Sequence, residues 1–572
     1  MTQKLRFGIM CSADRLPAAF AASVRELLET QAVELALLIV DEQPPRRTSI
    51  WEKIKTIFRL KGVLWAVRGR LYPLHRSSCY RPVDMSQTFA GLPRISCRVI
   101  RKGTFSQYFR AEDVAQIREV RLDFILRFAF GIIRGDILQA AKYGVWSFHH
   151  GDENKFRGGP PGFWEIYCNE PVTGAILQRL TDRLDAGVVL QRCFLVTHKF
   201  SQRASENALL WAAAYMPARV CRDILNGSAS YLHDMPSRTE APIRRAPNDL
   251  QMLKYLVKTT VAWIKWQTES ILMFQDWNIG VVRNPVEAFL QPGFRPEVRW
   301  LPYRKRNCFI ADPFIARIAG RMILLAEEFD GFRDRGRIMQ AELGEAGTFV
   351  SPVRKAIDEG VHMSYPNLFS YKSRIYCTPE CSAKRGVSLY IFDPDREEWS
   401  PAAQIIDNFA AVDPTLFEHE GRWWLFCSKQ GDCVDSKLYL WHAPDPFGPW
   451  EPHTANPVKC DVRSARPAGR PFLFQGNLYR PAQDSSRVYG GAITINRVTC
   501  LSVREYREEP AAVIHPCPDS RYPKGVHTLA GFVGDRLTII DGYRLSLAPA
   551  LISGRLRSKI DRLIRGMPDA IG

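Results

Sequence analysis

The first part of the chain alternates short apolar runs with stretches whose apolar residues recur at helical spacing. Residues 5–11 (LRFGIMC) and 33–40 (VELALLIV) are both typical of buried strands. Between them a helix is predicted from about Pro17 to Leu28, because proline suits a first helical turn, where its missing N–H is not needed. Alternating strands and helices predict a parallel sheet covered by helices on both faces.

The same alternation continues to residue 149. The pattern predicts a helix at 111–118, a buried strand at 122–128 (LDFILRF), a short helix around 136–141 and a strand at 144–149 (GVWSFH). In open parallel sheets, ligands bind beyond the carboxyl ends of the strands. His149 ends the last of these strands, so we expect it to face a binding site.

The sequence around residues 235–250, MPSRTEAPIRRAPNDLQ, is rich in proline and charge, which predicts a linker. A helical stretch follows at 252–274, and its lysines make it too charged to span a bilayer. We interpret it as a bridging helix, with contact to a membrane surface as the alternative. The predicted domains are therefore residues 1–235 and 277–560, joined by a linker and helix at 236–276.

From residue 277 onward, helical spacing gives way to a repeat of short hairpins. Each repeat begins with a turn and an apolar strand, followed by a polar turn and a second strand. A period near 50 residues made of hairpins alone is typical of a β-propeller. Five repeats predict five blades, with residues 277–282 (WNIGVV) as the strand that closes the ring. The repeats begin 53, 48, 53 and 61 residues apart, at Asp312, Tyr365, Asp413, Arg466 and His527.

Length and composition agree with two globular domains. A chain of 572 residues is too long for one hydrophobic core, and 46% hydrophobic with 24% charged residues excludes a disordered or fibrous protein. The 14 cysteines show no CxxC pair and no metal-finger spacing, so we expect buried thiols in a reducing compartment and no metal site.

The N-terminal residues lack the apolar core of a signal peptide, and no long uncharged apolar stretch occurs, so we expect a cytoplasmic protein. The net charge of +18 comes largely from scattered arginines. Residues 46–81 are denser, with ten basic residues against Glu52 and apolar residues near helical spacing. We favour a solvated helix that covers a sheet, with peripheral contact to an anionic membrane or a phosphorylated substrate as the alternative. Nucleic acid is not an expected partner, because no recognition module accompanies the charge.

Most of the candidate catalytic residues of the first domain lie within residues 144–191. A strand delivers His149 and His150, a Gly/Pro-rich loop passes Arg157, and a later strand begins at Thr173 and ends near Asp185. Two strand ends are thus expected to bring an imidazole and a carboxylate into one cleft. Such a pair suits the transfer of an acyl-level carbon to an amine, because the imidazolium stabilises a developing oxyanion and the carboxylate handles the proton of the amine.

This segment resembles the formyltransferase family, which includes glycinamide ribonucleotide, methionyl-tRNA and sugar-nucleotide formyltransferases. The family pattern runs Gly-x-x-Asn-x-His, then a loop with Arg-Gly and Pro, then Thr-Gly and Leu-Asp-x-Gly. The resemblance implies an α/β Rossmann-like formyltransferase domain that uses 10-formyltetrahydrofolate as donor and an amine as acceptor. The matching positions are Gly144, His149, Arg157-Gly158, Pro161, Thr173-Gly174 and Leu184-Asp185-Ala186-Gly187.

The resemblance also implies roles for individual residues. His149 and Asp185 take the catalytic positions, and Ser147 stands where the family has its catalytic asparagine. A serine hydroxyl is shorter than an amide and donates one hydrogen bond where the amide donates two. Residues 123–133 (DFILRFAFGII) match the strand and loop whose backbone holds the pterin. The implied substrate- and cofactor-binding residues are Phe128, Phe130, Gly131, Ile133, His150, Arg157, Gly158 and Thr173.

The repeat region resembles family 43 glycoside hydrolases and the N-terminal domain of plant glucosamine inositolphosphorylceramide transferases, through WNIGVV, ADPF, SYPNLF and AVDPTLF. First strands line the axial cavity of a propeller, so Asp312, Glu380 and Asp413 are candidates for acid–base glycoside chemistry. The alternative is structural, because aspartate accepts backbone hydrogen bonds in turns and proline fixes φ.

These observations predict a two-domain enzyme of glycan biosynthesis. Its first domain would move a formyl group from 10-formyltetrahydrofolate to the amine of a nucleotide- or lipid-linked amino sugar, and its propeller would recognise the carbohydrate. One alternative is a propeller-based glycoside hydrolase or glycosyltransferase beside a degenerate formyltransferase-like domain. Another is a non-catalytic scaffold at a membrane-associated glycan complex.

Overall fold

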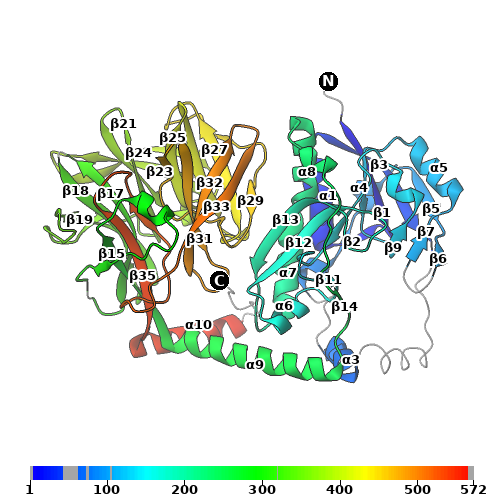
Figure 1. Cartoon of the computed structure of the whole chain (residues 1–572), viewed down its shortest axis with the longest axis horizontal. Coiled ribbons are helices and arrows are strands. Elements are labelled where there is room, and N and C mark those ends of the chain that lie inside the picture. Colours follow the sequence, from blue (N-terminus) through cyan, green and yellow to red (C-terminus); the bar gives the residue numbers. More distant parts are fainter. Residues whose placement is uncertain are drawn as a thin grey trace. The chain divides into compact units, whose positions relative to one another are not determined.

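The computed structural model describes residues 4–42, 62–71, 77–102, 106–303, 305–318 and 320–564. The chain divides into two compact units, 1–262 and 263–572 (Figure 1). The division falls inside helix α9 (Asp249–Leu272), not in the proline-rich segment before it. Most of the basic segment 46–81 lies outside the described residues; helix α3 (Val63–Leu71) is its longest described element.

Unit 1 is built on a seven-stranded sheet in the order β13-β12-β10-β8-β1-β3-β5. The five strands from β10 to β5 are parallel, but β12 and β13 run antiparallel to their neighbours, so the prediction of a fully parallel sheet is wrong at this edge. The strands are β1 (Leu5–Cys11), β3 (Val33–Asp41), β5 (Arg94–Cys97), β8 (Phe124–Arg127), β10 (Val145–His149), β12 (Val172–Arg179) and β13 (Val188–Val196).

Helices pack on this sheet through apolar stripes. Helix α1 (Ala18–Glu29) follows Pro17 and buries Ala21, Val24 and Leu27 at intervals of three residues, which fixes one face against the core. The predicted helix at 111–118 is confirmed as α5 (Ala111–Glu119). The remaining helices of unit 1 are α4 (Ser86–Phe89), α6 (Phe163–Cys168), α7 (Gln202–Ala213), α8 (Met216–Asn226) and the 3-10 helices η3 (Ser78–Tyr80), η4 (Asp136–Gln139) and η5 (Ser230–His233).

Short strands add three small sheets to unit 1. Strand β2 (Arg15–Pro17) pairs with β4 (Pro82–Asp84), and β7 (Ser106–Tyr108) lies between β6 (Ile100–Lys102) and β9 (Ile132–Arg134). Strand β11 (Arg157–Gly158) pairs with β14 (Ile243–Arg244), which ties residues beyond 235 to the loop that follows β10.

The predicted linker is part of unit 1. Arg157 Nε donates to the carbonyl oxygen of Ala241 (2.9 Å), and the Thr239 hydroxyl donates to that of Glu153 (2.6 Å). Trp164 Nε1 donates to the carbonyl oxygen of Arg245 (3.1 Å). These hydrogen bonds hold residues 236–248 against the rest of unit 1, so this segment is a packed strap and not a free linker. Unit 1 extends to residue 262, beyond the predicted domain end at 235.

The predicted helix at 252–274 is confirmed as α9, with both ends displaced toward the N-terminus by two or three residues. Its first half packs on unit 1, where the Tyr255 ring stacks on Phe163 at 4.6 Å and Lys258 Nζ donates to the Tyr167 carbonyl oxygen (2.6 Å). The helix ends where β15 (Met273–Val282) begins.

Unit 2 contains five separate antiparallel sheets of four or five strands. The first and last strands of the unit share one sheet, because β15 pairs with β35 (Thr538–Leu547) along ten residues of each. This pairing confirms the predicted strand at 277–282 and lengthens it. The other strands of this sheet are β16 (Val298–Trp300) and β34 (Leu529–Gly531).

The other four sheets follow the predicted repeat of hairpins. They are formed by β17 (Cys308–Ile318), β18 (Arg321–Asp330), β19 (Arg335–Leu343) and β20 (Arg354–Ile357); by β21 (Ser364–Tyr371), β22 (Arg374–Glu380), β23 (Gly386–Asp393) and β24 (Glu398–Asp407); by β25 (Ala411–His419), β26 (Arg422–Lys429), β27 (Lys437–Ala443), β28 (Glu451–Pro452) and β29 (Lys459–Cys460); and by β30 (Phe472–Phe474), β31 (Asn477–Asp484), β32 (Ala492–Leu501) and β33 (Tyr506–Ile514). Each sheet packs on the next through a separate apolar cluster.

The first three repeats begin with a β-bulge, where the sequence predicted a turn. Asp312, Tyr365 and Asp413 have φ of 50°, 45° and 51°, and the strand register shifts at each of them. A bulge bends its strand and re-aims a side chain. The repeated X-Pro pair therefore turns three side chains out of the ordinary alternation of their strands.

Helix α10 (Pro549–Ile564) follows the last strand, and Lys559 Nζ donates to Ser270 Oγ (2.6 Å) of α9. None of the described helices has both the length and the apolar character needed to cross a membrane. All 14 cysteines are free thiols and ten are buried, which agrees with the predicted role of most of them as small apolar residues.

Candidate functional site

The structure brings His149 and Asp185 together at the carboxyl end of β10. His149 Nδ1 lies 3.5 Å from Asp185 Oδ1, and Nε2 lies 3.1 Å from the carbonyl oxygen of Phe156. Each ring nitrogen therefore faces an oxygen that only accepts hydrogen bonds. The imidazolium form, which carries an N–H on both nitrogens, satisfies both oxygens.

Asp185 reaches His149 by a route that the sequence did not predict. Since β12 runs antiparallel to β10, the carboxyl end of β12 pairs with the beginning of β10, at Trp146, and not with its end. Asp185 lies instead in the connection between β12 and β13, with φ of 48°. Gly158 N–H donates to Asp185 Oδ2 (3.0 Å) and holds the carboxylate. The expected meeting of two strand ends is therefore wrong, although the two side chains do meet.

Ser147 is paired with Arg127, a residue that sequence reasoning missed. Arg127 Nε and Nη2 donate to Ser147 Oγ at 3.1 and 2.8 Å. Burial lowers the pKa of the guanidinium, and the charge of Asp185 opposes that shift. A delocalised cation thus stands beside the serine that replaces the asparagine of the family pattern. The signal in the sequence was a single arginine inside the apolar run LDFILRF.

The loop expected to hold a pterin also contacts Arg127. Arg127 Nη1 donates to the carbonyl oxygens of Phe130 (3.1 Å) and Gly131 (2.8 Å), and Gly131 N–H donates to Gln107 Oε1 (2.5 Å). A carbonyl oxygen has two lone pairs, so both carbonyls can accept a second hydrogen bond. The loop therefore fits a ring that donates hydrogen bonds, such as the amino-pyrimidine of a pterin, but its Gly131 donor is taken.

Two of the four predicted pterin residues act chiefly in packing. Ile133 is buried in the core of the sheet, so only its backbone is at the loop. Phe128 stacks on Phe20 with ring centroids 4.7 Å apart, in a column that continues through Phe148 and His150.

His150 and Thr173 stay predicted substrate-binding residues, and the structure gives the two side chains different surroundings. Burial is the main cause that lowers the pKa of His150 to about 3, so its ring is a neutral member of the aromatic column. Thr173 is buried, and its hydroxyl shares a hydrogen bond with that of Thr197 (2.8 Å). The Thr173 hydroxyl therefore has its partner inside the sheet, whereas the buried Nε2 of His150 has no hydrogen-bond partner among the described residues.

Arg157 and Gly158 shape the loop next to Asp185. The Arg157 guanidinium bonds to the strap at Ala241, which agrees with an ordering role. Gly158 has φ of 81°, and a Cβ at this position would lie 2.3 Å from the Arg244 carbonyl oxygen. Only glycine permits this close approach of β11 to β14.

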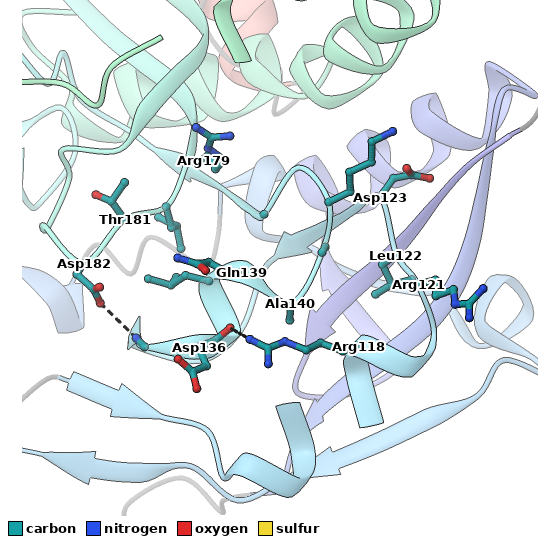
Figure 2. A pocket seen from close by; sticks show the side chains of 16 residues that line it. Arg118, Arg121, Leu122, Asp123, Asp136, Gln139, Ala140, Arg179, Thr181 and Asp182 are labelled. Carbon is teal, nitrogen blue, oxygen red and sulfur yellow. Dashed lines mark hydrogen bonds between the residues drawn. The ribbon is translucent and has the colours of Figure 1, made fainter. Parts of the chain in front are cut away.

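A cavity of about 970 Å³ opens at the amino ends of β8 and β10, away from the strand end that carries His149 (Figure 2). Asp123 and Gly144, which precede β8 and β10, line it together with Arg118 and Arg179. Asp182 Oδ1 closes one side by accepting from Gly135 N–H (3.2 Å). Neither His149 nor Asp185 lines this cavity, so we assign the site from side-chain geometry and not from the cavity.

Unit 2 holds a second constellation, around Asp312. Asp312 Oδ1 accepts from Thr528 Oγ1 (2.8 Å) and lies 3.6 Å from His527 Nε2, while His527 Nδ1 lies 2.5 Å from Asp541 Oδ2. Burial raises the pKa of Asp312 to about 6, although His527 opposes the shift. The His527 ring stacks on Trp277 at 4.0 Å.

The ligand atoms of Asp312, His527 and Asp541 all lie within 4.8 Å of one another. Nitrogen and carboxylate oxygen ligands suit several divalent metal ions, so these residues are able to hold one. The sequence pointed to no metal site, because these three residues lie far apart along the chain and show no ligand spacing.

Asp413 and Glu380 form the neighbouring part of this constellation. Arg466 Nε (2.6 Å) and Gln483 Nε2 (3.0 Å) donate to Asp413 Oδ2, and Asp413 N–H donates to Glu380 Oε2 (3.1 Å). Burial and the charge of Asp413 raise the pKa of Glu380 to about 8. Glu380 therefore carries a proton at neutral pH beside an aspartate that is paired with arginine.

Residues that begin the five repeats converge in this constellation. Tyr365 N–H donates to Asp312 Oδ2 (3.3 Å), and the Tyr365 hydroxyl accepts from Gly469 N–H (2.7 Å), close to Arg466. Arg466 pairs with Asp413, and His527 pairs with Asp312. The period near 50 residues was thus the signal in the sequence for His527 and Arg466, because both residues stand at the start of a repeat.

The N-terminal and C-terminal parts of the chain are similar to different known proteins. Residues 303–536 match the family described as glucosamine inositolphosphorylceramide transferase 1, N-terminal. Glucosamine inositolphosphorylceramide transferase 1 of Oryza sativa subsp. japonica is 34% identical over 207 residues, which cover 35% of this chain and 28% of that protein. The chain thus spans under a third of the length of this curated relative.

The N-terminal part is similar to formyltransferases over a shorter stretch. Methionyl-tRNA formyltransferase of Prochlorococcus marinus is 34% identical over 77 residues, which cover 13% of this chain and 23% of that protein.

Among solved structures, a family 117 glycoside hydrolase of Zobellia galactanivorans covers 47% of this chain and 80% of its own, with 15% identity and a TM-score of 0.31.

Proposed function

We propose that unit 1 transfers a formyl group from 10-formyltetrahydrofolate to the amine of an amino sugar, nucleotide- or lipid-linked, in glycan biosynthesis. The observation that carries this proposal is the pair formed by His149 Nδ1 and Asp185 Oδ1, 3.5 Å apart at the carboxyl end of a strand of an α/β sheet. The similarity of the N-terminal part to methionyl-tRNA formyltransferase supports the same chemistry.

Each residue of the site has a distinct task in this proposal. The bound donor supplies the formyl carbon. His149, as imidazolium, and Arg127, as guanidinium, place positive charge where a carbonyl oxygen becomes negative as the amine attacks. Asp185 orients the imidazole and accepts the proton that the amine loses, directly or through water. The bond between N10 of the folate and the formyl carbon breaks, and that proton passes to N10, so tetrahydrofolate leaves.

Arg127 compensates for the missing asparagine in this proposal. Ser147 Oγ accepts two hydrogen bonds from Arg127 and donates a long one to the Phe148 carbonyl oxygen (3.4 Å), which an oxyanion would have to displace. The guanidinium fixes the direction of that hydroxyl and adds a charge that an amide lacks.

The acceptor is proposed from unit 2. Five antiparallel sheets, with the first and last strands paired in one of them, support a five-bladed propeller. The match of residues 303–536 to the glucosamine inositolphosphorylceramide transferase domain supports a propeller that recognises a carbohydrate. We place the reaction in the cytoplasm, because 14 free thiols suit a reducing compartment.

The test is a transfer assay with the full chain. Purified protein is incubated with 10-formyltetrahydrofolate and a panel of UDP- and dTDP-amino sugars, and mass spectrometry detects the gain of one carbonyl group. We expect product with the wild type, none with His149→Ala or Asp185→Asn, and full product with the exposed control His233→Ala. Product that persists in His149→Ala would refute the proposal, as would the absence both of product from the wild type and of folate binding in calorimetry.

A second candidate function places glycoside chemistry in unit 2. The observation that favours it is the pKa of about 8 for Glu380, next to the carboxylate of Asp413. A carboxyl group whose pKa is raised, held beside a second carboxyl group, is the pattern of a general acid and its partner. If Glu380→Gln and Asp312→Asn abolish hydrolysis of a glycoside panel, and His149→Ala has no effect on any activity of the chain, this candidate replaces the first.

A further inference from the structure

Helix α9 carries apolar side chains on two opposite faces. One face packs on unit 1, where Met252, Tyr255 and Thr259 are buried. The opposite face presents a second apolar row at intervals of three and four residues. This row, named here the α9 stripe, consists of Leu250, Leu253, Val257, Val261 and Ile264, which are 77%, 54%, 57%, 60% and 53% exposed.

An exposed apolar row of this length is unusual for a helix on a globular unit. A surface helix normally turns polar residues to water, and contiguous exposed apolar patches mark binding surfaces. Leu256 and Trp263 are also exposed and widen the stripe along one border. Tryptophan suits a boundary between water and hydrocarbon, because its ring is apolar and its N–H is polar.

Helix α3 extends this surface within unit 1. Asp249 Oδ1, at the start of α9, accepts from Leu64 N–H (2.8 Å), so α3 lies beside the first turn of α9 (Figure 1). Val63 and Val67 lie one helical turn apart on α3 and are 42% and 45% exposed. The apolar surface therefore does not end with α9.

Charge decides what covers the stripe. Lys254, Lys258 and Lys265 line its other border, because they follow stripe residues by one or four positions on a helix of 3.6 residues per turn. The side chains of Lys254 and Lys265 are exposed, whereas Lys258 donates to Tyr167 and Asn169 of unit 1. Within α3 and α9 there are five basic residues and two acids, and one of those acids, Asp249, is bonded to α3. A second copy of the chain would bring two basic borders together, whereas an anionic surface would neutralise them.

We propose that the α9 stripe docks into the interface of a bilayer that contains anionic lipid. The apolar row enters the boundary between headgroups and acyl chains, and the exposed side chains of Lys254 and Lys265 extend toward the headgroups. This inference rests on α9 and α3 alone and does not depend on the function proposed for His149 and Asp185.

The test measures flotation of the full chain with vesicles of phosphatidylcholine, with and without phosphatidylglycerol. We expect binding to the anionic vesicles to exceed binding to the neutral ones by about tenfold or more, and to fall as salt rises. The variant L253S/V257S/V261S should lose this binding. The control I100S/L225S/M235S replaces three exposed apolar residues elsewhere in unit 1 and should keep it.

Trp263 supplies a second readout. Its fluorescence should shift to the blue when anionic vesicles are added, and the shift should be missing in Trp263→Phe, although 13 other tryptophans remain. Because the stripe residues are exposed, the triple variant should keep the thermal midpoint of the wild type.

Three outcomes overturn the proposal. The wild type fails to bind anionic vesicles; the triple variant binds as well as the control; or sedimentation velocity without lipid shows a dimer that the triple variant loses. The last result would make the stripe an interface between copies of the chain. A failed transfer assay leaves this proposal standing, and failed flotation leaves the proposed function standing.

Discussion

Single side chains in both units are held by more than one oppositely charged or hydrogen-bonding group. His149 is fixed between the Phe156 carbonyl and Asp185, and Arg127 divides its donors among Ser147 and two backbone carbonyls. Asp413 is held by Arg466 and Gln483. Because each of these groups has several fixed partners, its orientation is set before any substrate binds, which is the condition for electrostatic stabilisation.

Arg127→Lys tests the role of the guanidinium. A lysine keeps the charge, but its compact ammonium cannot reach Ser147 and both carbonyls at once. If the proposed transfer is right, kcat should fall by roughly 10- to 100-fold, with a smaller change in KM, because the lost interaction acts mainly in the transition state. The exposed Arg101→Lys is the control. An unchanged kcat in Arg127→Lys would remove Arg127 from the mechanism.

Glu380 makes the stability of the chain depend on pH. Its pKa of about 8 in the folded chain lies above the value of about 4.3 for an unfolded glutamate, so the folded state holds the proton more tightly. The stabilisation from this group is complete below pH 4 and is lost as pH rises through 8.

Glu380→Gln keeps the neutral form at every pH and should therefore match the wild type near pH 4. At pH 8 to 9 its thermal midpoint should be several degrees higher. Scanning calorimetry across this range measures the difference, with the exposed Glu398→Gln as control. Parallel curves for Glu380→Gln and the wild type would show that Glu380 ionises as freely as an exposed acid.

At the scale of elements, small irregularities in strands decide where side chains point. The β-bulges at Asp312, Tyr365 and Asp413, where φ is positive, turn first-strand residues toward one buried constellation. The close pair of β11 and β14 does the same in unit 1, because it holds the Gly158 N–H against Asp185. Regular strands would have left these groups on alternate faces.

Gly158→Ala tests the close pair. Its Cβ would lie 2.3 Å from the Arg244 carbonyl oxygen, so β11 must move and take its N–H away from Asp185. We expect a loss of about 2–3 kcal/mol in the free energy of unfolding and a fall in transfer activity.

The matched control for this change is Gly227→Ala. Gly227 also has positive φ, at 72°, but nothing lies within 4 Å of its added Cβ, so it carries the backbone strain alone. Equal losses of stability and activity in the two variants would show that the contact with Arg244 has no role.

At the scale of the whole molecule, the boundary between units is set by packing. The proline-rich strap at 236–248 bonds to Glu153, Arg157 and Trp164, and therefore completes unit 1. Proline and charge suit a strap as well as a free linker, because both lack helical spacing. Only the partners of its backbone distinguish the two.

Truncation tests this boundary. A chain that ends at residue 235 loses β14 and the three hydrogen bonds of the strap, whereas one that ends at 262 keeps them. Circular dichroism should show a cooperative thermal transition for the longer fragment and a clearly lower midpoint, or none, for the shorter one. Equal midpoints would mean that the strap adds nothing to unit 1.

Local spacing along the chain was enough to locate most helices and strands, the hairpin repeat, and His149 at the end of its strand, whereas Asp185 was found through its family motif. This is because alternation and helical spacing record which face of each element is buried. The direction of β12, the strap, the Arg127–Ser147 pair, the convergence of Asp312, Asp413, Arg466 and His527, and the exposure of the α9 stripe were decided only by tertiary structure. Each of these depends on which distant segment lies opposite a residue, and burial alone does not encode the identity of that segment.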